Sequence, residues 1–215
     1  MRAIASLSLI LCLAISAGTA FAGAQQRENL DPSVRAALQK ALSDNTSLKL
    51  AFTDEAEAEH WVATMSERLA KRIPDERVRV EFLKTLHYEA TRAGLDPQLV
   101  LGLTQVESGF RKYAISVASA RGFMQVMPFW LKELGRPDDN LFDMRTNLRF
   151  GCTILRHYLN VEKGNLFRAL GRYNGSLGRA EYPNKVLAAW RSHWSYKPPF
   201  KKPILGSTQR AEQNS

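Results

Sequence analysis

The amino-acid sequence predicts an all-helical fold. Apolar residues recur at steps of three and four in one segment after another, which is the spacing of one face of a helix. Several of these segments begin at an Asp-Pro pair or another aspartate and end at glycine or before proline, as helices do. No segment shows the period-two alternation of a strand. With 215 residues, of which 45% are hydrophobic, the chain is long enough for one compact domain with extensions.

Residues 1–22 predict a secretory signal peptide. Arg2 provides the positive start, residues 4–15 are mostly apolar, and Ala20-Phe21-Ala22 is a cleavage site of the small-residue type. The alternative interpretations are a membrane anchor and a buried helix, but the apolar stretch is short for a helix that spans a bilayer. We therefore expect an exported, periplasmic protein that begins at Gly23.

One cysteine remains after this cleavage, because Cys12 lies inside the apolar stretch. Cys152 therefore has no partner for an intramolecular disulfide. It lies between Phe150 and Ile154 in an apolar helical segment. We expect a buried thiol that acts as a small hydrophobic side chain rather than as a nucleophile.

Residues 23–73 predict a helical extension ahead of the main domain. A first helix begins at Asp31-Pro32, and its apolar side chains recur at four-residue steps. A second helix runs from about residue 54 to residue 72 and stops before Pro74. The apolar faces of the two helices comprise Val34, Leu38 and Leu42, and Trp61, Met65, Leu69 and Ile73.

Residues 74–196 predict the main domain as a series of helices. The segment 111–119 predicts at most a small hairpin or an irregular loop between them. The tail, residues 197–215, is rich in proline, lysine and small polar residues and is expected to be flexible. The expected helices cover about residues 75–93, 97–107, 122–134, 146–159, 165–172 and 183–195.

Glu107 is the candidate catalytic residue. It lies at the end of the helix that opens with Asp96-Pro97 and whose apolar face should be buried. A glutamate beside such a face is partly desolvated, which raises its pKa, as a general acid at neutral pH requires. The alternative is a glutamate that points into water, as most do. The apolar face comprises Leu99, Val100, Leu103 and Val106.

Four segments, in order along the chain, resemble those of a known family. They are Glu107-Ser108, Gly122-Phe123-Met124-Gln125 with Met127-Pro128 behind it, Tyr173-Asn174, and Tyr182. In these residues the chain resembles the soluble lytic transglycosylases with a lysozyme-like SLT domain, over about residues 84–195. The chain departs from the usual pattern of this family at Phe123, at Ser119-Ala120 and around Tyr173-Asn174. These departures bear on the shape of the sugar-binding subsites and not on Glu107.

The resemblance implies a lysozyme-like fold and a specific reaction. Glu107 would act as the single general acid and base, cleaving the bond between N-acetylmuramic acid and N-acetylglucosamine and giving a 1,6-anhydro product without water. The acidic residues between Glu107 and Tyr173 lie outside the matching segments. Asp138-Asp139 predicts a turn and Asp143 a helix cap, so a mechanism with one carboxylate fits the sequence.

The other matching residues are expected to bind substrate. The amide of Gln125 suits sugar hydroxyl or acetamido groups, and Met124 suits an apolar sugar face. Ser108 either orients Glu107 or caps the next turn. The alternative to substrate contact is core packing for Met124 and the tyrosines, and a solvated helix position for Gln125. We expect the four tryptophans to lie in the core. Tyr173, Asn174 and Tyr182 add hydroxyl and amide groups beside flat rings. A hydrogen bond from Tyr173 to the Glu107 carboxyl is also expected.

The sequence predicts no metal and no cofactor, because the four histidines are far apart and no phosphate-binding loop is present. The net charge is +9, or +8 without Arg2. It suits a carboxylate-rich polymer such as the glycan strands of peptidoglycan, or it is merely a solvated basic surface. The basic residues are scattered, so we expect no nucleic-acid partner. We expect a monomer, and partners in cell-envelope assembly remain unspecified.

Two other functions fit the same residues. A goose-type lysozyme would share the scaffold but let water attack the sugar. A noncatalytic module for wall binding or assembly would keep the shape for recognition alone.

Overall fold

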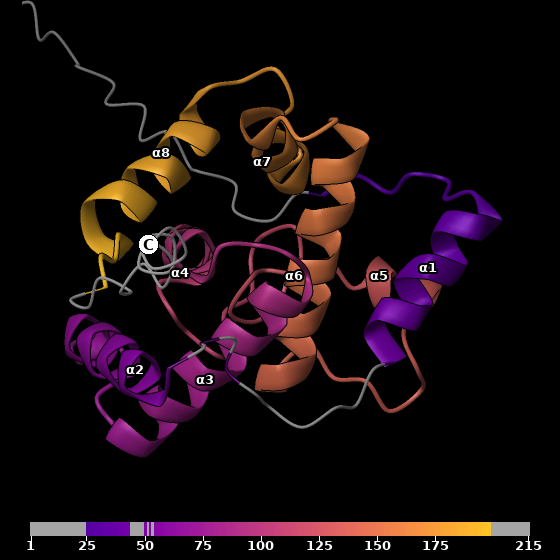
Figure 1. Ribbon diagram of the computed structural model, residues 1–215. Coiled ribbons are helices and arrows are strands. Elements are labelled where there is room, and N and C mark those ends of the chain that lie inside the picture. The colour runs from indigo at the N-terminus through magenta and orange to yellow at the C-terminus, as the bar shows by residue number, and fades with distance from the viewer. Residues whose placement is uncertain (1–24, 44–49, 51, 53, 199–215) are drawn as a thin grey trace, which may run out of the picture.

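The computed structural model describes residues 25–43, 50, 52 and 54–198, and within them the fold consists of helices joined by loops (Figure 1). The signal peptide expected at residues 1–22 lies outside the described residues, as does the tail beyond residue 198. In the described part of the chain, none of the helices is both long enough and apolar enough to cross a membrane. Cys152 is a buried free thiol, as expected.

Seven of the expected helices are present, with ends that differ from the prediction by a few residues. The helices of the described residues are α1 (Pro32–Ser43), α2 (Glu55–Leu69), α3 (Glu76–Arg92), α4 (Pro97–Ser108), α5 (Phe129–Leu134), α6 (Met144–Val161), α7 (Leu166–Asn174) and α8 (Glu181–Ala189), which continues as the π-helical turn η1 (Trp190–Trp194).

The helix expected over residues 122–134 is wrong in its first half. Gly122 and Gln125 have positive φ angles of 74° and 48°, which a right-handed helix cannot contain. Arg121 instead pairs with Ile115 and Val126 through isolated antiparallel bridges. The irregular loop expected over residues 111–119 therefore continues through the Gly-Phe-Met-Gln segment, and the helix is the short α5 that follows Pro128.

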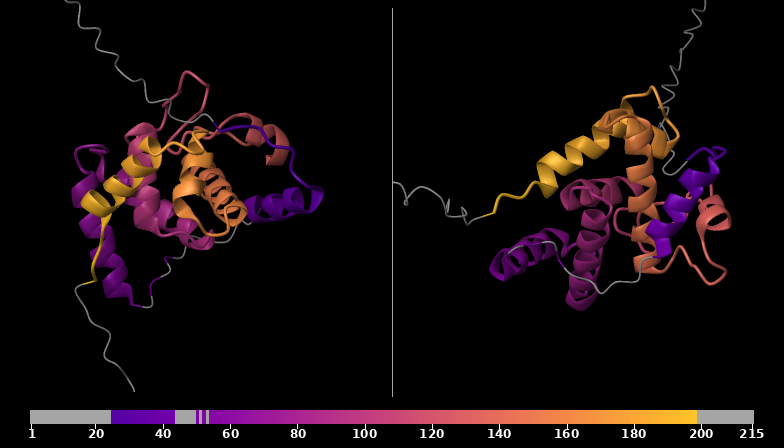
Figure 2. Two further views of the ribbon diagram at one scale, coloured as in Figure 1. Left: turned by 90° about the horizontal axis from the view of Figure 1, so that it is seen from above. Right: turned by 45° about the vertical axis from the view of Figure 1, so that its right-hand side comes forward.

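Helices α4 and α6 form the centre of the molecule. Helix α6 packs against α1, α3 and α7, and α4 packs against α3, α8 and η1. Figure 1 shows α6 running through the middle with α4 beside it, and the views in Figure 2 show α8 lying across α4. Between these helices lies one apolar core, in which Trp61, Trp130 and Trp194 are buried as expected.

The sequence fixes both ends of α4. Asp96 caps its first turn by accepting hydrogen bonds from the backbone of Gln98 and Leu99, and Pro97 takes the position where no backbone donor is needed. Gly109 ends the helix in the left-handed conformation. Within the helix, a Cβ on Gly102 would lie 2.9 Å from the backbone nitrogen of Trp190, so only glycine lets the junction of α8 and η1 approach this closely.

A buried carboxylate, Glu89 on α3, links three parts of the fold. It pairs with Arg92 of its own helix at 3.0 Å, and with Arg145 and Arg149 of α6 at 3.4 and 3.1 Å. Arg149 also donates to the backbone oxygen of Leu42 at the end of α1. The carboxylate has no solvent exposure, so these arginines supply the charge that its burial requires.

We expect Glu89→Gln to lower the free energy of unfolding by about 3 kcal/mol, because the three guanidinium groups lose their shared counter-charge in a poorly solvated place. Urea denaturation measures the change. Glu81→Gln, at an exposed position of the same helix, is the matched control and should change stability by less than about 0.5 kcal/mol. Equal stability of the two variants would contradict the role given to Glu89.

Candidate active site

Glu107 lies in the last turn of α4 with its side chain turned into the protein. The residue is only 5% exposed, so the alternative of a solvated helix-end glutamate is wrong. Its Oε1 atom accepts a hydrogen bond from the hydroxyl of Tyr182 on α8. Its Oε2 atom is buried and has no hydrogen-bond partner among the described residues. One carboxyl oxygen is therefore held by the protein and the other is left for a different partner.

Burial dominates the electrostatics of Glu107. The loss of solvation raises the pKa of the carboxyl from 4.5 to about 8, while the hydrogen bond from Tyr182 acts in the opposite direction. No cation pairs with the carboxyl in the described structure, in contrast to Glu89. Glu107 is consequently protonated at neutral pH, with a pKa close enough to neutrality for it to give up and regain a proton.

Ser108 fastens the end of α4 to the Gly-Phe-Met-Gln segment. Its hydroxyl donates to the backbone oxygen of Phe123 at 2.7 Å and accepts from the backbone nitrogen of Phe110 at 3.1 Å. These contacts correspond to the capping alternative, and they contain no bond to the Glu107 carboxyl. Ser108 therefore positions the backbone that carries Glu107.

The Gly-Phe-Met-Gln segment is held against α6 by Asn147. This side chain donates to the backbone oxygens of Arg121 and Leu141, both at 2.8 Å, and accepts from the backbone nitrogen of Met124 at 2.8 Å. A Cβ on Gly122 would lie 2.5 Å from the Leu141 oxygen, and its φ is positive, so glycine is required here. The sequence reading missed Asn147, since nothing in its own surroundings marks it.

Two residues expected to contact substrate are instead buried in the structure. The Met124 side chain is in the core against Gly151 of α6, where an added Cβ would collide with it. The Gln125 amide nitrogen donates to the backbone oxygens of Ala114 at 3.1 Å and Gly122 at 2.9 Å. Both side chains therefore shape the loop, and a direct contact of either with sugar stays a prediction.

Tyr173 and Asn174 end α7 beside the same loop. The Tyr173 hydroxyl donates to the backbone oxygen of Met124 at 2.8 Å, so it braces the loop. The hydrogen bond to Glu107 expected from Tyr173 comes instead from Tyr182. Asn174 donates to Ser176 at 3.0 Å, and its buried Oδ1 has no partner among the described residues. The structure thus brings Glu107, Ser108, Met124, Gln125, Tyr173 and Tyr182 into one connected set.

Gln25 is a member of this set that the sequence reading missed. It is only 3% exposed, and its side chain bonds the backbone of Gln125 and Met127. It lies in the polar segment before α1, about sixty residues ahead of the first matching helix, where no pattern marks one glutamine over the next.

The other acidic residues between Glu107 and Tyr173 serve the fold or lie in solvent. Glu133 pairs with Arg27, and Glu162 pairs with Arg168 and Arg172. Asp143 caps α6, as expected, by accepting from the backbone of Thr146 at 2.8 Å. Asp139 closes the expected turn by accepting from the backbone of Arg136 at 2.8 Å, and Asp138 is exposed.

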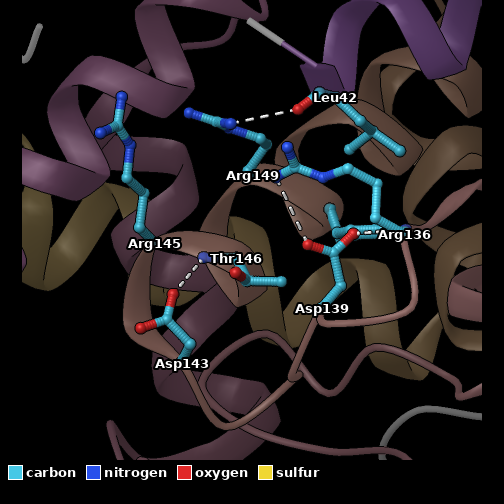
Figure 3. Close-up of a pocket in the computed structure, with 8 residues that line it drawn as sticks. Leu42, Arg136, Asp139, Asp143, Arg145, Thr146 and Arg149 are labelled. Carbon is cyan, nitrogen blue, oxygen red and sulfur yellow. Dashed lines mark hydrogen bonds and ion pairs between the residues drawn. The ribbon is translucent and has the colours of Figure 1, made fainter. Parts of the chain in front are cut away.

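A cavity of about 130 Å³ lies at the N-terminal end of α6, away from Glu107 (Figure 3). Its charged groups already have partners: Arg136 pairs with Asp139, and Arg149 bonds Leu42 and Glu89. The polar groups that line it are therefore committed to the fold, and the cavity does not compete with Glu107 as a reaction centre. Its lining comprises Leu42, Arg136, Asp139, Asp143, Arg145, Thr146, Arg149 and Phe150.

These features define a helical domain with one buried carboxyl group that lacks a cation. Residues 84–188 match the family model described as "Transglycosylase SLT domain". This segment, just under half of the chain, belongs to the SLT-type lytic transglycosylase family, and the expected all-helical fold is confirmed in the described residues.

The chain is similar to several described proteins of this kind. It is 32% identical over 115 residues to a transglycosylase of Enterobacteria phage PRD1, and the aligned region covers 50% of this chain and 42% of that protein. It is 41% identical over 113 residues to the membrane-bound lytic murein transglycosylase C of Histophilus somni 2336, covering 45% and 31%. It is 39% identical over 84 residues to that of Mannheimia succiniciproducens, covering 35% and 24%. The chain thus spans less than half the length of these relatives.

Among solved structures, an inactive mutant of the lytic transglycosylase Slt from Pseudomonas aeruginosa aligns with 77% of this chain and 34% of its own, with a TM-score of 0.42 and 19% sequence identity.

We expect the stability of the protein to fall as Glu107 loses its proton. The pKa of Glu107 in the folded protein is about 8, above the ordinary value of 4.5. The protonated carboxyl therefore contributes its full stabilisation below about pH 4.5, and this contribution is lost as the pH rises through 8. Relative to Glu107→Gln, the wild type should lose up to about 1.4 kcal/mol of unfolding free energy per pH unit across this window. Urea denaturation of both proteins from pH 4 to pH 9 tests this. A constant difference between them would contradict burial of the carboxyl.

In the wild type, the hydrogen bond from Tyr182 stabilises the charged carboxylate and so lowers the pKa of Glu107. We expect Tyr182→Phe to remove this effect and to raise the pKa by about one unit. A carbon-13 NMR titration of the glutamate carboxyl measures the shift. Tyr158→Phe is the matched control, since Tyr158 is a buried tyrosine on α6 whose ring packs by Trp130. An unchanged or lower pKa in Tyr182→Phe would refute the assigned contact.

Proposed function

We propose that the protein is an exported peptidoglycan lytic transglycosylase in which Glu107 is the single general acid and base. The observation that carries the proposal is a buried glutamate with a pKa of about 8, one hydrogen bond and no cation, inside a domain of the SLT family. The names of the relatives, which include murein transglycosylases, support the same substrate. Residues 74–196 would form the catalytic domain and residues 23–73 its helical extension.

The first step is transfer of a proton from Glu107 to the oxygen that links N-acetylmuramic acid to N-acetylglucosamine. The Oε2 atom suits this transfer, because it has no protein partner among the described residues. The bond to the muramyl carbon then breaks, and positive charge develops on that sugar. The Tyr182 hydroxyl, which donates to Oε1, stabilises the carboxylate that this step leaves behind.

The second step returns a proton to Glu107. The carboxylate accepts the proton of the muramyl 6-hydroxyl group, and that oxygen bonds to its own sugar carbon to give the 1,6-anhydro ring. The raised pKa favours this return, since burial makes the protonated form the more stable one. Atoms balance without water, and the held hydroxyl reacts at a high effective concentration.

A second protein carboxylate is unnecessary in this scheme. The acetamido group of the substrate can stabilise the positively charged sugar. The pairing of Glu133, Asp139 and Glu162 with arginines, and the capping role of Asp143, agree with a mechanism that uses Glu107 alone.

The remaining parts of the proposal concern location and partners. The glycan strands of peptidoglycan are the proposed substrate, and the periplasm is the proposed location. We propose a monomer that needs no cofactor and binds no nucleic acid. A goose-type lysozyme would use the same glutamate but release reducing ends, and a noncatalytic wall-binding module would release nothing.

We expect Glu107→Gln to lose release of muropeptides from purified sacculi by at least about a thousandfold while still folding, because an amide is far too weak an acid to donate a proton to the glycosidic oxygen. Wild-type products should be lighter by one water than hydrolysis products, as mass spectrometry will show. Glu181→Gln, at an exposed position next to Tyr182, is the control and should keep full activity.

The rate should also depend on pH with a defined sign. Since Glu107 must be protonated to act, kcat/KM should fall about tenfold per unit above a pH of about 8.

Reducing ends among the products would select the lysozyme instead, and intact sacculi with folded wild-type protein would select the noncatalytic module.

A further inference from the structure

The segment in front of α1 reaches the loop beside the catalytic residue. Gln25 donates from Nε2 to the backbone oxygen of Gln125 at 3.2 Å, and its Oε1 accepts from the backbone nitrogen of Met127 at 3.2 Å. A residue far outside the SLT match of residues 84–188 thus lies among the groups around Glu107.

The backbone atoms that hold Gln25 form a free edge. Val126 uses its own nitrogen and oxygen to pair with Arg121, both at 3.0 Å. Because a trans peptide directs its C=O and its N–H to opposite sides, the flanking oxygen of Gln125 and nitrogen of Met127 point away from the bridge. There they present one acceptor and one donor side by side, and the Gln25 amide fills both.

This pair of atoms suits a primary amide, which presents an N–H donor and a C=O acceptor on the same side. The acetamido group of a sugar is a trans amide whose N–H and C=O point to opposite sides, so it can bond either of the two backbone atoms but not both at once. The proposed substrate carries an acetamido group on every sugar. The Gln125 amide nitrogen is already bonded to Ala114 and Gly122, so it is not free to donate to such a group. The backbone of Gln125 and Met127 is then a further place on this loop for acetamido recognition.

The contacts that hold the segment are of a kind that water can replace. Arg27 pairs with Glu133 at 2.6 Å, but the Arg27 side chain is 70% exposed. Glu28 pairs with Arg172 at 2.6 Å, and both side chains are partly exposed. Exposed ion pairs stabilise little, so the two bonds of Gln25 are the specific part of the attachment.

We propose that residues 25–28 form a releasable strap in which the Gln25 amide occupies the place of a substrate acetamido group on the backbone of Gln125 and Met127. The described state is then the closed one, in agreement with the burial of Glu107, and a glycan strand binds by displacing the strap. The identity of the displacing ligand rests on the proposed function, whereas occupation of the edge by Gln25 does not.

The test compares Gln25→Ala with the wild type by calorimetric titration with tri-N-acetylchitotriose. Because a closed strap lowers the fraction of protein that can bind, its removal should tighten binding about tenfold. In sacculus digestion the same variant should lower KM by a similar factor and leave kcat unchanged. Gln26→Ala is the matched control, since Gln26 is the same residue type one position on and is exposed. It should change neither quantity.

Glu28→Ala provides a second route to the same state. It removes the ion pair with Arg172 without touching the edge, so it should tighten oligosaccharide binding in the same direction by a smaller factor. Circular dichroism and thermal unfolding establish that each variant is folded. If Gln25→Ala does not fold, Glu28→Ala decides the question alone.

The outcomes separate this proposal from the proposed function. Unchanged or weaker chitotriose binding in folded Gln25→Ala, or in Glu28→Ala when that variant decides, would overturn the strap and leave Gln25 as a brace of the loop, whatever the sacculus assay shows. Tighter binding by a protein that releases no muropeptides would support the strap and overturn the proposed reaction. A lower kcat in Gln25→Ala would likewise overturn the strap, because displacement of a competitor affects KM alone.

Discussion

The site depends on the removal of one carboxyl group from water without a cation to compensate it. Glu107 and Glu89 show the two ways in which this protein buries a glutamate. Glu89 is surrounded by three arginines, and its charge then joins α3 to α6. Glu107 has a tyrosine hydroxyl instead, so its protonated, neutral form is the more stable one in the folded protein. The neighbours thus separate a charged carboxylate that joins two helices from a carboxyl group that burial keeps neutral.

The rest of the fold can be understood as the support for that arrangement. Helix α4 carries Glu107, α8 supplies Tyr182, and the close approach of the two helices at Gly102 brings the groups together. The side of the site opposite α8 is a loop, and a loop has backbone groups that need partners. Asn147, Ser108 and Tyr173 supply these partners from three different helices. Short irregular backbone is therefore held as firmly as the helices around it.

Much of the fold could be predicted from the sequence because its signals are local. The Asp-Pro pair at residues 96–97 and the apolar steps along α4 place the helix and turn Glu107 inward. The helix expected from Gly122 failed because propensity says little about positive φ angles, which tertiary hydrogen bonds to Asn147 sustain here. The hydrogen bond to Glu107 is expected from Tyr173 but comes from Tyr182, since which hydroxyl reaches the carboxyl depends on how α7 and α8 pack.

The contact of Gln25 lay beyond sequence reasoning for a related reason. A side-chain amide bonded to free backbone leaves no periodicity, cap or motif, and the neighbouring Gln26 is identical in type and exposed. In the proposed strap, a substrate acetamido group would compete with the Gln25 amide for one of these two backbone atoms, and burial from water strengthens the bond for either occupant. The backbone groups that the proposal assigns to substrate are thus the ones that hold the protein's own chain.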